Sequence, residues 1–213
     1  MTRAKLSRRG AIGVAALSIG GAWLGGRLAG EFSQGRDVSD VMDVTALQNA
    51  PGFPSEGAED ARVTVLVFSD YACGVCRRTE PVWRAAVREA GDVRVVHRDW
   101  PILGEQSRRA ARVALAAGRQ GLYAPVHQIL MRTGRHDEEA LRQAVTVAGG
   151  DWARLERDLV TDAEPIDRLL ARTAQDAFQL GFRGTPGYLV GPLGIEGAAS
   201  QRQFAKAIEK ARG

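Results

Sequence analysis

The chain has 213 residues, of which 45% are hydrophobic and 25% are charged. This balance is typical of a globular protein and excludes a disordered or collagen-like chain. The length predicts one domain with room for an insertion, and two cysteines are too few for a disulfide-stapled scaffold. The net charge of +4 comes from residues 1–36, which carry +5 and leave the remainder almost neutral. Nucleic-acid binding, which needs basic residues clustered on the folded domain, is therefore not indicated.

The first 30 residues have the layout of an export signal. Residues 2–9 are basic and residues 10–26 carry no charge. As a helix, the uncharged run would span roughly 26 Å at about 1.5 Å per residue, slightly less than the ~30 Å hydrocarbon core of a bilayer. We expect residues 1–30 to be either a cleaved export signal or an N-terminal membrane anchor. Ser7-Arg8-Arg9 resembles a twin-arginine signal, and a plain positive segment explains it equally well.

The next segments predict a strand–helix–strand unit. Residues 31–58 have weak patterning and contain Pro51, Gly52, Pro54 and Gly57, so we expect a linker. Residues 62–68 are almost all apolar and β-branched, which predicts a buried strand. A helix is expected from Cys73 to about Ala90, and a second strand over residues 93–97. Strand, helix and strand within so short a stretch predict a βαβ unit with parallel strands.

The rest of the chain is expected to be helical and then to return to β structure. Apolar residues at helical spacing predict five helices in a block over about residues 104–181. Two short strands follow, at residues 187–190 and 195–196. Residues 200–203 form a Ser-x-x-Gln capping box that opens a last helix. The order βαβ, helical block, ββα predicts an α/β fold with an inserted helical subdomain.

Both cysteines lie in one Cys-x-x-Cys motif, Cys73-Gly74-Val75-Cys76, between the first strand and its helix. Spacing of three residues in the first turn of a helix brings two sulfurs close enough to bond. The unpaired N–H groups and positive dipole at that end stabilise a thiolate at Cys73 and lower its pKa. In an exported protein, where the compartment is oxidising, this arrangement predicts thiol–disulfide exchange, with Cys73 as nucleophile and Cys76 as resolving thiol.

Three alternatives remain for the motif. The cysteines can be buried and inert, or they can form a purely structural disulfide, which would constrain the unfolded chain little. A zinc site would need two further ligands, and the histidines available are His97, His127 and His136, none at ligand spacing from another. A metal- or peptide-binding module without turnover would bind metal and show no reactive thiolate.

The motifs together resemble those of the DsbA-type thiol–disulfide oxidoreductases of the thioredoxin superfamily. The likeness spans about residues 59–211 and covers the residues around the cysteine pair, Pro81 in the helix, residues 96–104 after the second strand, and Gly184-Thr185-Pro186. It implies a thioredoxin-like fold with the helical block as the family's insertion. It also implies that Pro186 is cis beside the cysteines and that the backbone of Thr185 pairs with a substrate strand.

Two departures from the family pattern bear on mechanism. The buried acid that thioredoxin and the best-known DsbA proteins carry six residues before the first cysteine is replaced by Val67. Asp70 is the nearest acid, and we expect it to cap the start of the helix. The dipeptide between the cysteines is Gly-Val rather than the Pro-His of strongly oxidising members, so no polar side chain there supports the thiolate.

The resemblance implies a periplasmic enzyme that forms disulfides in unfolded or reduced exported proteins, with no cofactor, no metal and no nucleic acid. A quinone-linked membrane partner would re-oxidise it, and the N-terminus would contact the membrane if it is not cleaved. A disulfide reductase or isomerase, including one that serves cytochrome c maturation, is the alternative. Trp100 can line the substrate face or pack in the core.

Overall fold

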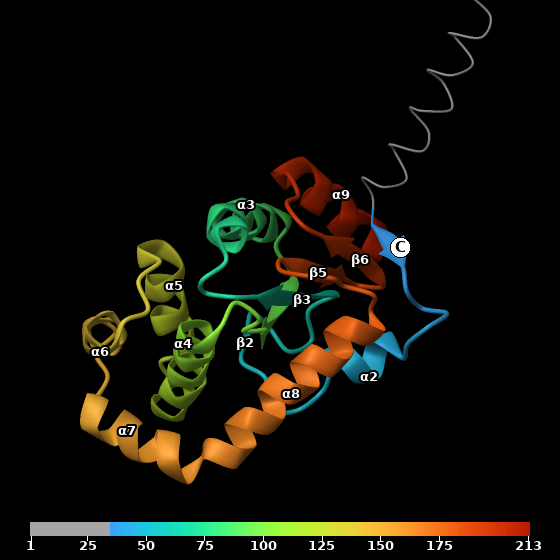
Figure 1. The fold of residues 1–213 in the computed structure, drawn as a ribbon. Coiled ribbons are helices and arrows are strands. Elements are labelled where there is room, and N and C mark those ends of the chain that lie inside the picture. The colour runs from blue at the N-terminus through green and yellow to red at the C-terminus, as the bar shows by residue number, and fades with distance from the viewer. Residues whose placement is uncertain (1–34) are drawn as a thin grey trace, which may run out of the picture.

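The computed structural model describes residues 35–213, and the expected export signal or anchor at residues 1–30 lies outside this part of the chain. Its helices are arranged around one sheet (Figure 1). In chain order the elements are β1 (Arg36–Asp37), α2 (Val44–Gln48), β2 (Ser55–Glu56), β3 (Val63–Ser69), α3 (Gly74–Ala90), β4 (Val93–Asp99), α4 (Glu105–Ala117), a 3-10 turn (Gly118–Gln120), α5 (Tyr123–Thr133), α6 (Glu138–Val147), α7 (Trp152–Thr161), α8 (Ala163–Gln179), β5 (Gly187–Val190), β6 (Leu193–Glu196) and α9 (Gln201–Ala211).

The described strands form one mixed sheet in the order β1-β6-β5-β3-β4-β2. β3 and β4 are parallel, as the βαβ pattern predicts, and they pair from Val63 with Val93 to Ser69 with Asp99. β5 runs antiparallel to β3, and β6 runs antiparallel to β5. The carboxyl ends of β3 and β4 and the start of β5 therefore meet at the same edge of the sheet, where Cys73 and Pro186 lie.

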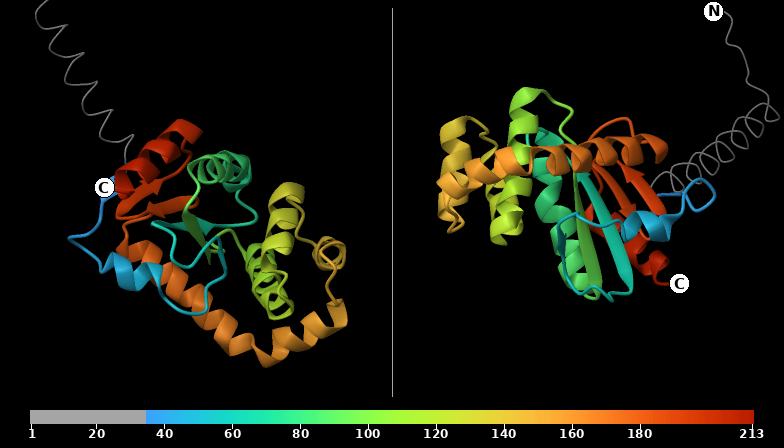
Figure 2. Two further views of the ribbon diagram at one scale, coloured as in Figure 1. Left: turned by 180° about the vertical axis from the view of Figure 1, so that it is seen from behind. Right: turned by 90° about the horizontal axis from the view of Figure 1, so that it is seen from below.

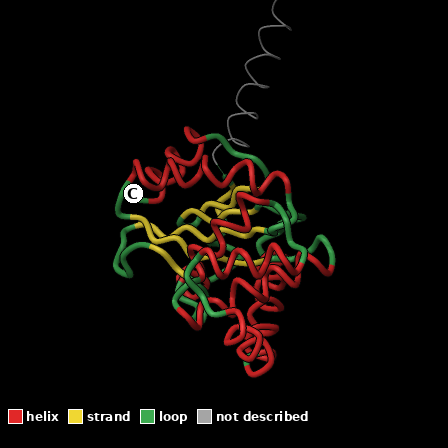
Figure 3. Tube along the Cα trace, turned by 90° about the vertical axis from the view of Figure 1, so that its left-hand side faces the viewer, coloured by secondary structure: helices red, strands yellow, loops and turns green. Residues whose placement is uncertain are grey.

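Helices cover both faces of the sheet, which is why β3 is apolar at nearly every position. Val63, Val65 and Val67 pack in the same core cluster as residues of α3 and α9. Leu66 and Phe68 point to the opposite face and pack with α8 and α2. This alternation follows the two-residue repeat of a strand. Figure 3 shows the strands between the two helical layers.

The helical block predicted for residues 104–181 runs from α4 to α8, beside the sheet (Figures 1 and 2). Its helices enclose a core of their own, rich in alanine and leucine, and α8 then crosses the sheet to return the chain to β5. Tyr71, Cys73 and Cys76 belong to this same core cluster, so the block forms one wall of the cysteine site. No helix within residues 35–213 has both the length and the apolar character required to cross a membrane.

The segment expected to be a linker at residues 31–58 is part of the fold where the structure describes it. β1 pairs with β6 and β2 pairs with β4, so this segment supplies both edges of the sheet. Val38 and Leu47 are 0% and 4% exposed and lie in the core beneath α8. The Pro- and Gly-rich stretch is a connection between α2 and β2 rather than a boundary between domains.

Candidate functional site

Cys73 is the residue directly before α3, at the edge of the sheet where β3 ends. Its side chain is the N-cap of the helix, and its sulfur accepts a hydrogen bond from the backbone N–H of Cys76 at 3.3 Å. The backbone N–H of Cys73 donates to the Asp70 carbonyl at 3.0 Å, which fixes the turn that leads into the helix. The sulfur thus lies among the unpaired N–H groups of a helix N-terminus, where negative charge is stabilised.

The two sulfurs differ in burial and in acidity. Cys73 is 7% exposed and Cys76 is 2% exposed, and both are free thiols in this structure. Burial raises the pKa of Cys73, but hydrogen bonds from the Cys76 side chain and backbone and from Thr185 outweigh it, so the pKa is lowered overall. Burial raises the pKa of Cys76 well above its usual value. Cys73 is therefore the thiol that ionises first and the one that solvent reaches more easily.

Thr185 and Pro186 lie directly against the cysteine pair, as the sequence resemblance implies. The peptide bond between them is cis. The Cys73 thiol lies 3.4 Å from the Thr185 carbonyl oxygen and donates to it. Both residues precede β5, the strand that pairs with β3, and this pairing brings the loop to the sulfur across 112 positions of sequence. The structure thus unites the four residues that the sequence singled out.

Asp70 does not cap α3, because the N-cap is Cys73 itself. The Asp70 side chain is 1% exposed and joins two loops at the active-site edge of the sheet. One oxygen accepts hydrogen bonds from the backbone of Ala72 and from the Ser107 hydroxyl, and the other accepts from the backbone of Ile102 and Leu103. Asp70 is therefore a structural carboxylate that holds the residues before Cys73 against the loop after β4. Trp100, in that loop, is 9% exposed and packs in the core.

A buried chain of polar groups connects the turn before Cys73 with α3 and α5. The Tyr71 hydroxyl lies 2.9 Å from Nδ1 of His127, and Nε2 of His127 lies 3.2 Å from the Glu80 carboxylate. Burial opposes ionisation of Glu80, but hydrogen bonds and charge from His127 and Arg84 lower its pKa to about 2. Glu80 is one helical turn beyond Cys76, and Val67, where the family carries its acid, is an apolar core residue.

A second group of buried polar residues lies beside the first. The His97 ring centroid is 4.5 Å from that of His127, and Nε2 of His97 lies 2.7 Å from the Glu56 carboxylate. Burial lowers the pKa of His97 to about 4, so this ring is neutral at pH 7. Burial also raises the pKa of Asp99, which accepts from the Tyr123 hydroxyl, to about 6. Residues 35–213 contain no group of three or more His, Cys, Asp or Glu side chains placed to hold a metal ion.

The sequence singled out His97 and His127 only as possible zinc ligands, and it did not single out Glu80. Their convergence depends on how α5 docks against α3 and how β2 adds to the sheet edge, and neither contact leaves a periodic signal in the sequence. One signal was present in the sequence: each of these ionisable residues is flanked by core residues. A buried ionisable side chain needs a buried polar partner, so each position indicates one.

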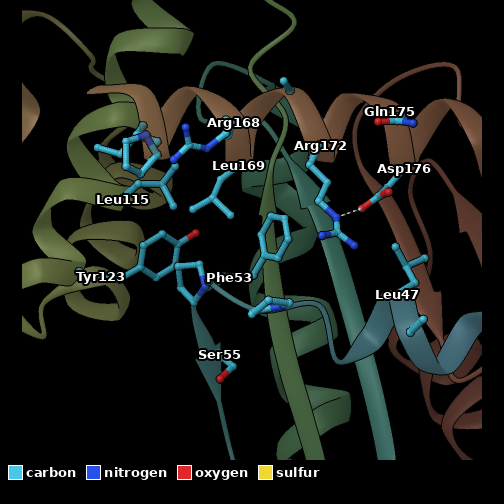
Figure 4. A pocket seen from close by; sticks show the side chains of 18 of the residues that line it. Leu47, Phe53, Ser55, Leu115, Tyr123, Arg168, Leu169, Arg172, Gln175 and Asp176 are labelled. Atoms are coloured by element: carbon cyan, nitrogen blue, oxygen red, sulfur yellow. Dashed lines mark ion pairs between the residues drawn. The ribbon is translucent and has the colours of Figure 1, made fainter. Parts of the chain in front are cut away.

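A groove of about 1350 Å³ lies between α8 and the segment that contains α2 and β2 (Figure 4). Phe53 and Tyr123 lie in it, and Arg172 lies 3.8 Å from the Asp176 carboxylate on its α8 side. None of Cys73, Cys76, Thr185 and Pro186 lines it. The groove is thus separate from the cysteine site.

Comparison with known proteins identifies relatives of both the sequence and the fold. A family model described as thioredoxin matches residues 50–210. A thioredoxin-like oxidoreductase from Silicibacter pomeroyi DSS-3 is 37% identical, with a TM-score of 0.76 over 80% of this chain and 98% of that one. A periplasmic thioredoxin-like protein from Salmonella enterica serovar Typhimurium is 28% identical, with a TM-score of 0.66 over 80% and 97% of the two chains. The thiol-disulfide exchange protein alpha-DsbA2 from Wolbachia pipientis has the same fold at 23% identity, with a TM-score of 0.75 over 81% and 92%.

The curated relatives with similar sequences are longer proteins. The Na(+)/H(+) antiporter NhaA 3 of Salinispora tropica is 27% identical over 92% of this chain, which corresponds to 33% of the antiporter. The antiporter NhaA 1 of Salinispora arenicola is 26% identical over 94% of this chain and 32% of its own length. The chain thus spans about a third of the length of these curated relatives.

Proposed function

The chain belongs to the thioredoxin family, and on that basis we propose that it is a DsbA-type thiol–disulfide oxidoreductase that forms disulfides in exported proteins through Cys73 and Cys76. The proposal rests chiefly on one observation. The Cys73 sulfur lies at the start of α3 and 3.4 Å from the carbonyl of Thr185, whose neighbour Pro186 is cis. This geometry places the Cys73 sulfur at a helix N-terminus, which stabilises a thiolate, and beside the Thr185 backbone, with which a substrate strand would pair.

In the proposed reaction the enzyme begins with a disulfide between Cys73 and Cys76. A substrate thiolate attacks the Cys73 sulfur, so a new bond forms between substrate and Cys73 while the bond to Cys76 breaks. Cys76 leaves as a thiolate and takes up a proton, because its pKa in the reduced protein is strongly raised. A second substrate thiolate then attacks the substrate sulfur and releases the Cys73 thiolate. Two electrons pass from the substrate to the cysteine pair.

Thr185 is the proposed site of substrate pairing. A substrate strand that pairs with backbone groups of this residue is held by main-chain contacts, which accept many side chains and suit a protein that acts on unfolded chains. The strand would pass directly over the Cys73 sulfur because that sulfur already contacts the Thr185 carbonyl. The side chains beside the substrate cysteine would then meet α3 on one side and the loop before Pro186 on the other.

Oxidation in the periplasm, with re-oxidation by a quinone-linked membrane partner, is the direction we propose. The periplasmic neighbour supports the location, and the exchange protein of the same fold supports thiol–disulfide exchange. A reductase or isomerase is the second candidate, and it is favoured by the dipeptide Gly74-Val75, which offers the thiolate no polar side chain. The likeness to Na(+)/H(+) antiporters covers about a third of those proteins, so we do not extend the proposal to ion transport.

Two measurements test the proposal. Cys76→Ser removes the resolving thiol, so this variant should accumulate mixed disulfides through Cys73 when it is mixed with reduced and oxidised substrate proteins. A folded Cys76→Ser protein that forms no mixed disulfide would contradict exchange chemistry. Parallel assays of reduced-peptide oxidation and insulin reduction decide the direction. Faster peptide oxidation supports an oxidase, and faster insulin reduction would replace it with the reductase candidate.

A further inference from the structure

The two residues after the second cysteine are arginines, and the guanidinium of each lies beside a glycine. A Cβ atom at Gly134 would lie 1.8 Å from the guanidinium of Arg77, which donates to the Gly134 carbonyl at 3.4 Å. A Cβ atom at Gly74 would lie 3.4 Å from the guanidinium of Arg78. Arg77 is thus tied to the helical block, and Arg78 extends along the dipeptide between the cysteines, over the residue next to Cys73.

A third arginine, Arg183, lies in the loop before β5, two residues ahead of Thr185. Its side chain is 89% exposed, and its nearest acid is Glu196, at 3.9 Å. Within residues 35–213, neither Arg77 nor Arg78 forms an ion pair, and Arg78 is exposed.

Glu196 offsets part of the charge of Arg183, whereas no acidic side chain of the described residues forms an ion pair with Arg77 or Arg78. Asp70 is buried and accepts hydrogen bonds from four donors, so its charge is already compensated inside the protein. Glu105, which is exposed, lies in the first turn of α4, just after the loop that follows β4. Arg77 and Arg78 are therefore cations close to Cys73 without an ion-pair partner in the described part of the chain, although residues 37–213 together are nearly neutral.

We propose that Arg78, assisted by Arg183, selects substrate segments in which the reactive cysteine is flanked by Asp or Glu. The proposal deepens the function proposed above and rests on it. A substrate strand paired with Thr185 would place its residues next to the cysteine between α3 and the loop that holds Arg183. Carboxylates at those positions meet two guanidinium groups, whereas Lys or Arg side chains are repelled.

The charge of Arg78 is available to a substrate because other groups set the pKa of the Cys73 thiol. The pKa of Cys73 is set chiefly by burial and by hydrogen bonds from Cys76 and Thr185. Since Arg78 and Arg183 are exposed, each would form a solvent-exposed ion pair with a substrate carboxylate, and salt weakens such pairs. The preference should therefore be modest and should act on the rate at which substrates are captured.

The test uses the full chain and three peptides that are identical except at the two positions beside a single cysteine, which are both Glu, both Gln or both Lys. Rates of the first exchange step with the oxidised protein are measured by stopped-flow fluorescence. The ratio of the Glu rate to the Lys rate is compared between proteins, because this comparison cancels the effect of flanking charge on the peptide thiol itself. Arg78→Gln should lower the ratio about two- to fivefold, the size expected of exposed ion pairs. High salt should lower the wild-type ratio as well.

The matched control is Arg88→Gln, at an exposed position in the last turn of the same helix, which should leave the ratio unchanged. Arg78→Lys, which keeps the charge, should retain most of the preference, and Arg183→Gln should lower it independently of any effect on α3. A ratio that is the same in wild type, Arg78→Gln and Arg183→Gln would overturn this inference while the Gln peptide still reacts. Failure of wild type to react with the Gln peptide would instead overturn the proposed function.

Discussion

The carboxylate of Asp70 lies 2.8 Å from the backbone nitrogen of Ile102, and this hydrogen bond ties the turn before Cys73 to the loop after β4. The same side chain also accepts from Leu103, Ala72 and Ser107, so four donors depend on one buried acid. The two loops come from parallel strands that end at the same edge of the sheet. Asp70 therefore makes the position of the cysteine turn depend on a loop about 30 residues further along the chain.

Asp70→Asn should destabilise the protein by about 2–4 kcal/mol, because an amide NH2 group would face two buried donors and each orphaned donor costs about 1–3 kcal/mol. Urea unfolding at pH 7 measures the change. Asp60→Asn is the control, since Asp60 is exposed and makes no hydrogen bond within the described residues. It should shift stability by no more than about 0.5 kcal/mol. Equal stability of the two variants would show that Asp70 does not hold the loops together.

Glu80→Gln should cost about 2–4 kcal/mol at pH 7, because Glu80 accepts from His127, Arg84 and Trp83 in a buried position. The pKa of Glu80 is lowered to about 2 in the folded protein, so its contribution is fully present above about pH 4.5 and is lost as the pH falls towards 2. The difference in unfolding free energy between wild type and Glu80→Gln should therefore shrink over that range. Glu156→Gln, at an exposed position of α7, should show no such dependence. A difference in unfolding free energy that stays constant with pH would contradict the role of Glu80 as a buried, ionised acceptor.

A chain that begins at Gly35 should fold and retain redox activity, whereas one that begins at Glu59 should be markedly less stable. The shorter chain loses the buried side chains of Val38 and Leu47, each worth about 1.5–3 kcal/mol when fully buried. It also loses the Glu56 carboxylate that accepts from Arg84 and His97. Thermal unfolding followed by circular dichroism compares the two. Similar melting temperatures would contradict this prediction and indicate that the residues before 59 are a linker.

Val75→His should make the cysteine pair more oxidising. Wild type is expected to have a reduction potential between the roughly −270 mV of thioredoxin and the roughly −120 mV of DsbA. A histidine in the first turn of α3 adds a donor and partial positive charge near Cys73, which stabilises the thiolate and should raise the potential by on the order of 30 mV, or ~1.4 kcal/mol. Val75→Gln is the polar but uncharged control. Equilibration with glutathione measures each potential, and an unchanged value in Val75→His would show that other groups set it.

Strong local patterns in the sequence predicted the central fold. The apolar run of β3, the Cys-x-x-Cys spacing and the Ser-x-x-Gln box at Ser200 are each local patterns, and the structure contains a strand, a helix start and a capping box at those places. The edge strands β1 and β2 have two residues each, too few to show a two-residue repeat.

Contacts between distant segments account for what the sequence left unresolved. Asp70 was expected to cap the nearby helix, yet its partners Ile102 and Leu103 lie in a loop that only the pairing of β3 with β4 brings close. The contact of His127 with Tyr71 likewise joins positions 56 residues apart. The site at Cys73 and Thr185 was found because a family resemblance, rather than spacing, pointed to the loop at Pro186.

The pH dependence of alkylation of the reduced protein, mapped residue by residue after reaction with iodoacetamide, tests the central claim most directly. Cys73 is the more exposed sulfur and has the lowered pKa, whereas the pKa of Cys76 is strongly raised by burial. Label should therefore appear on Cys73 first, with an apparent pKa below the usual value of about 8.5, while Cys76 stays unmodified throughout that range. Labelling of Cys76 before Cys73, or a Cys73 pKa at or above about 8.5, would contradict the assignment of Cys73 as the nucleophile.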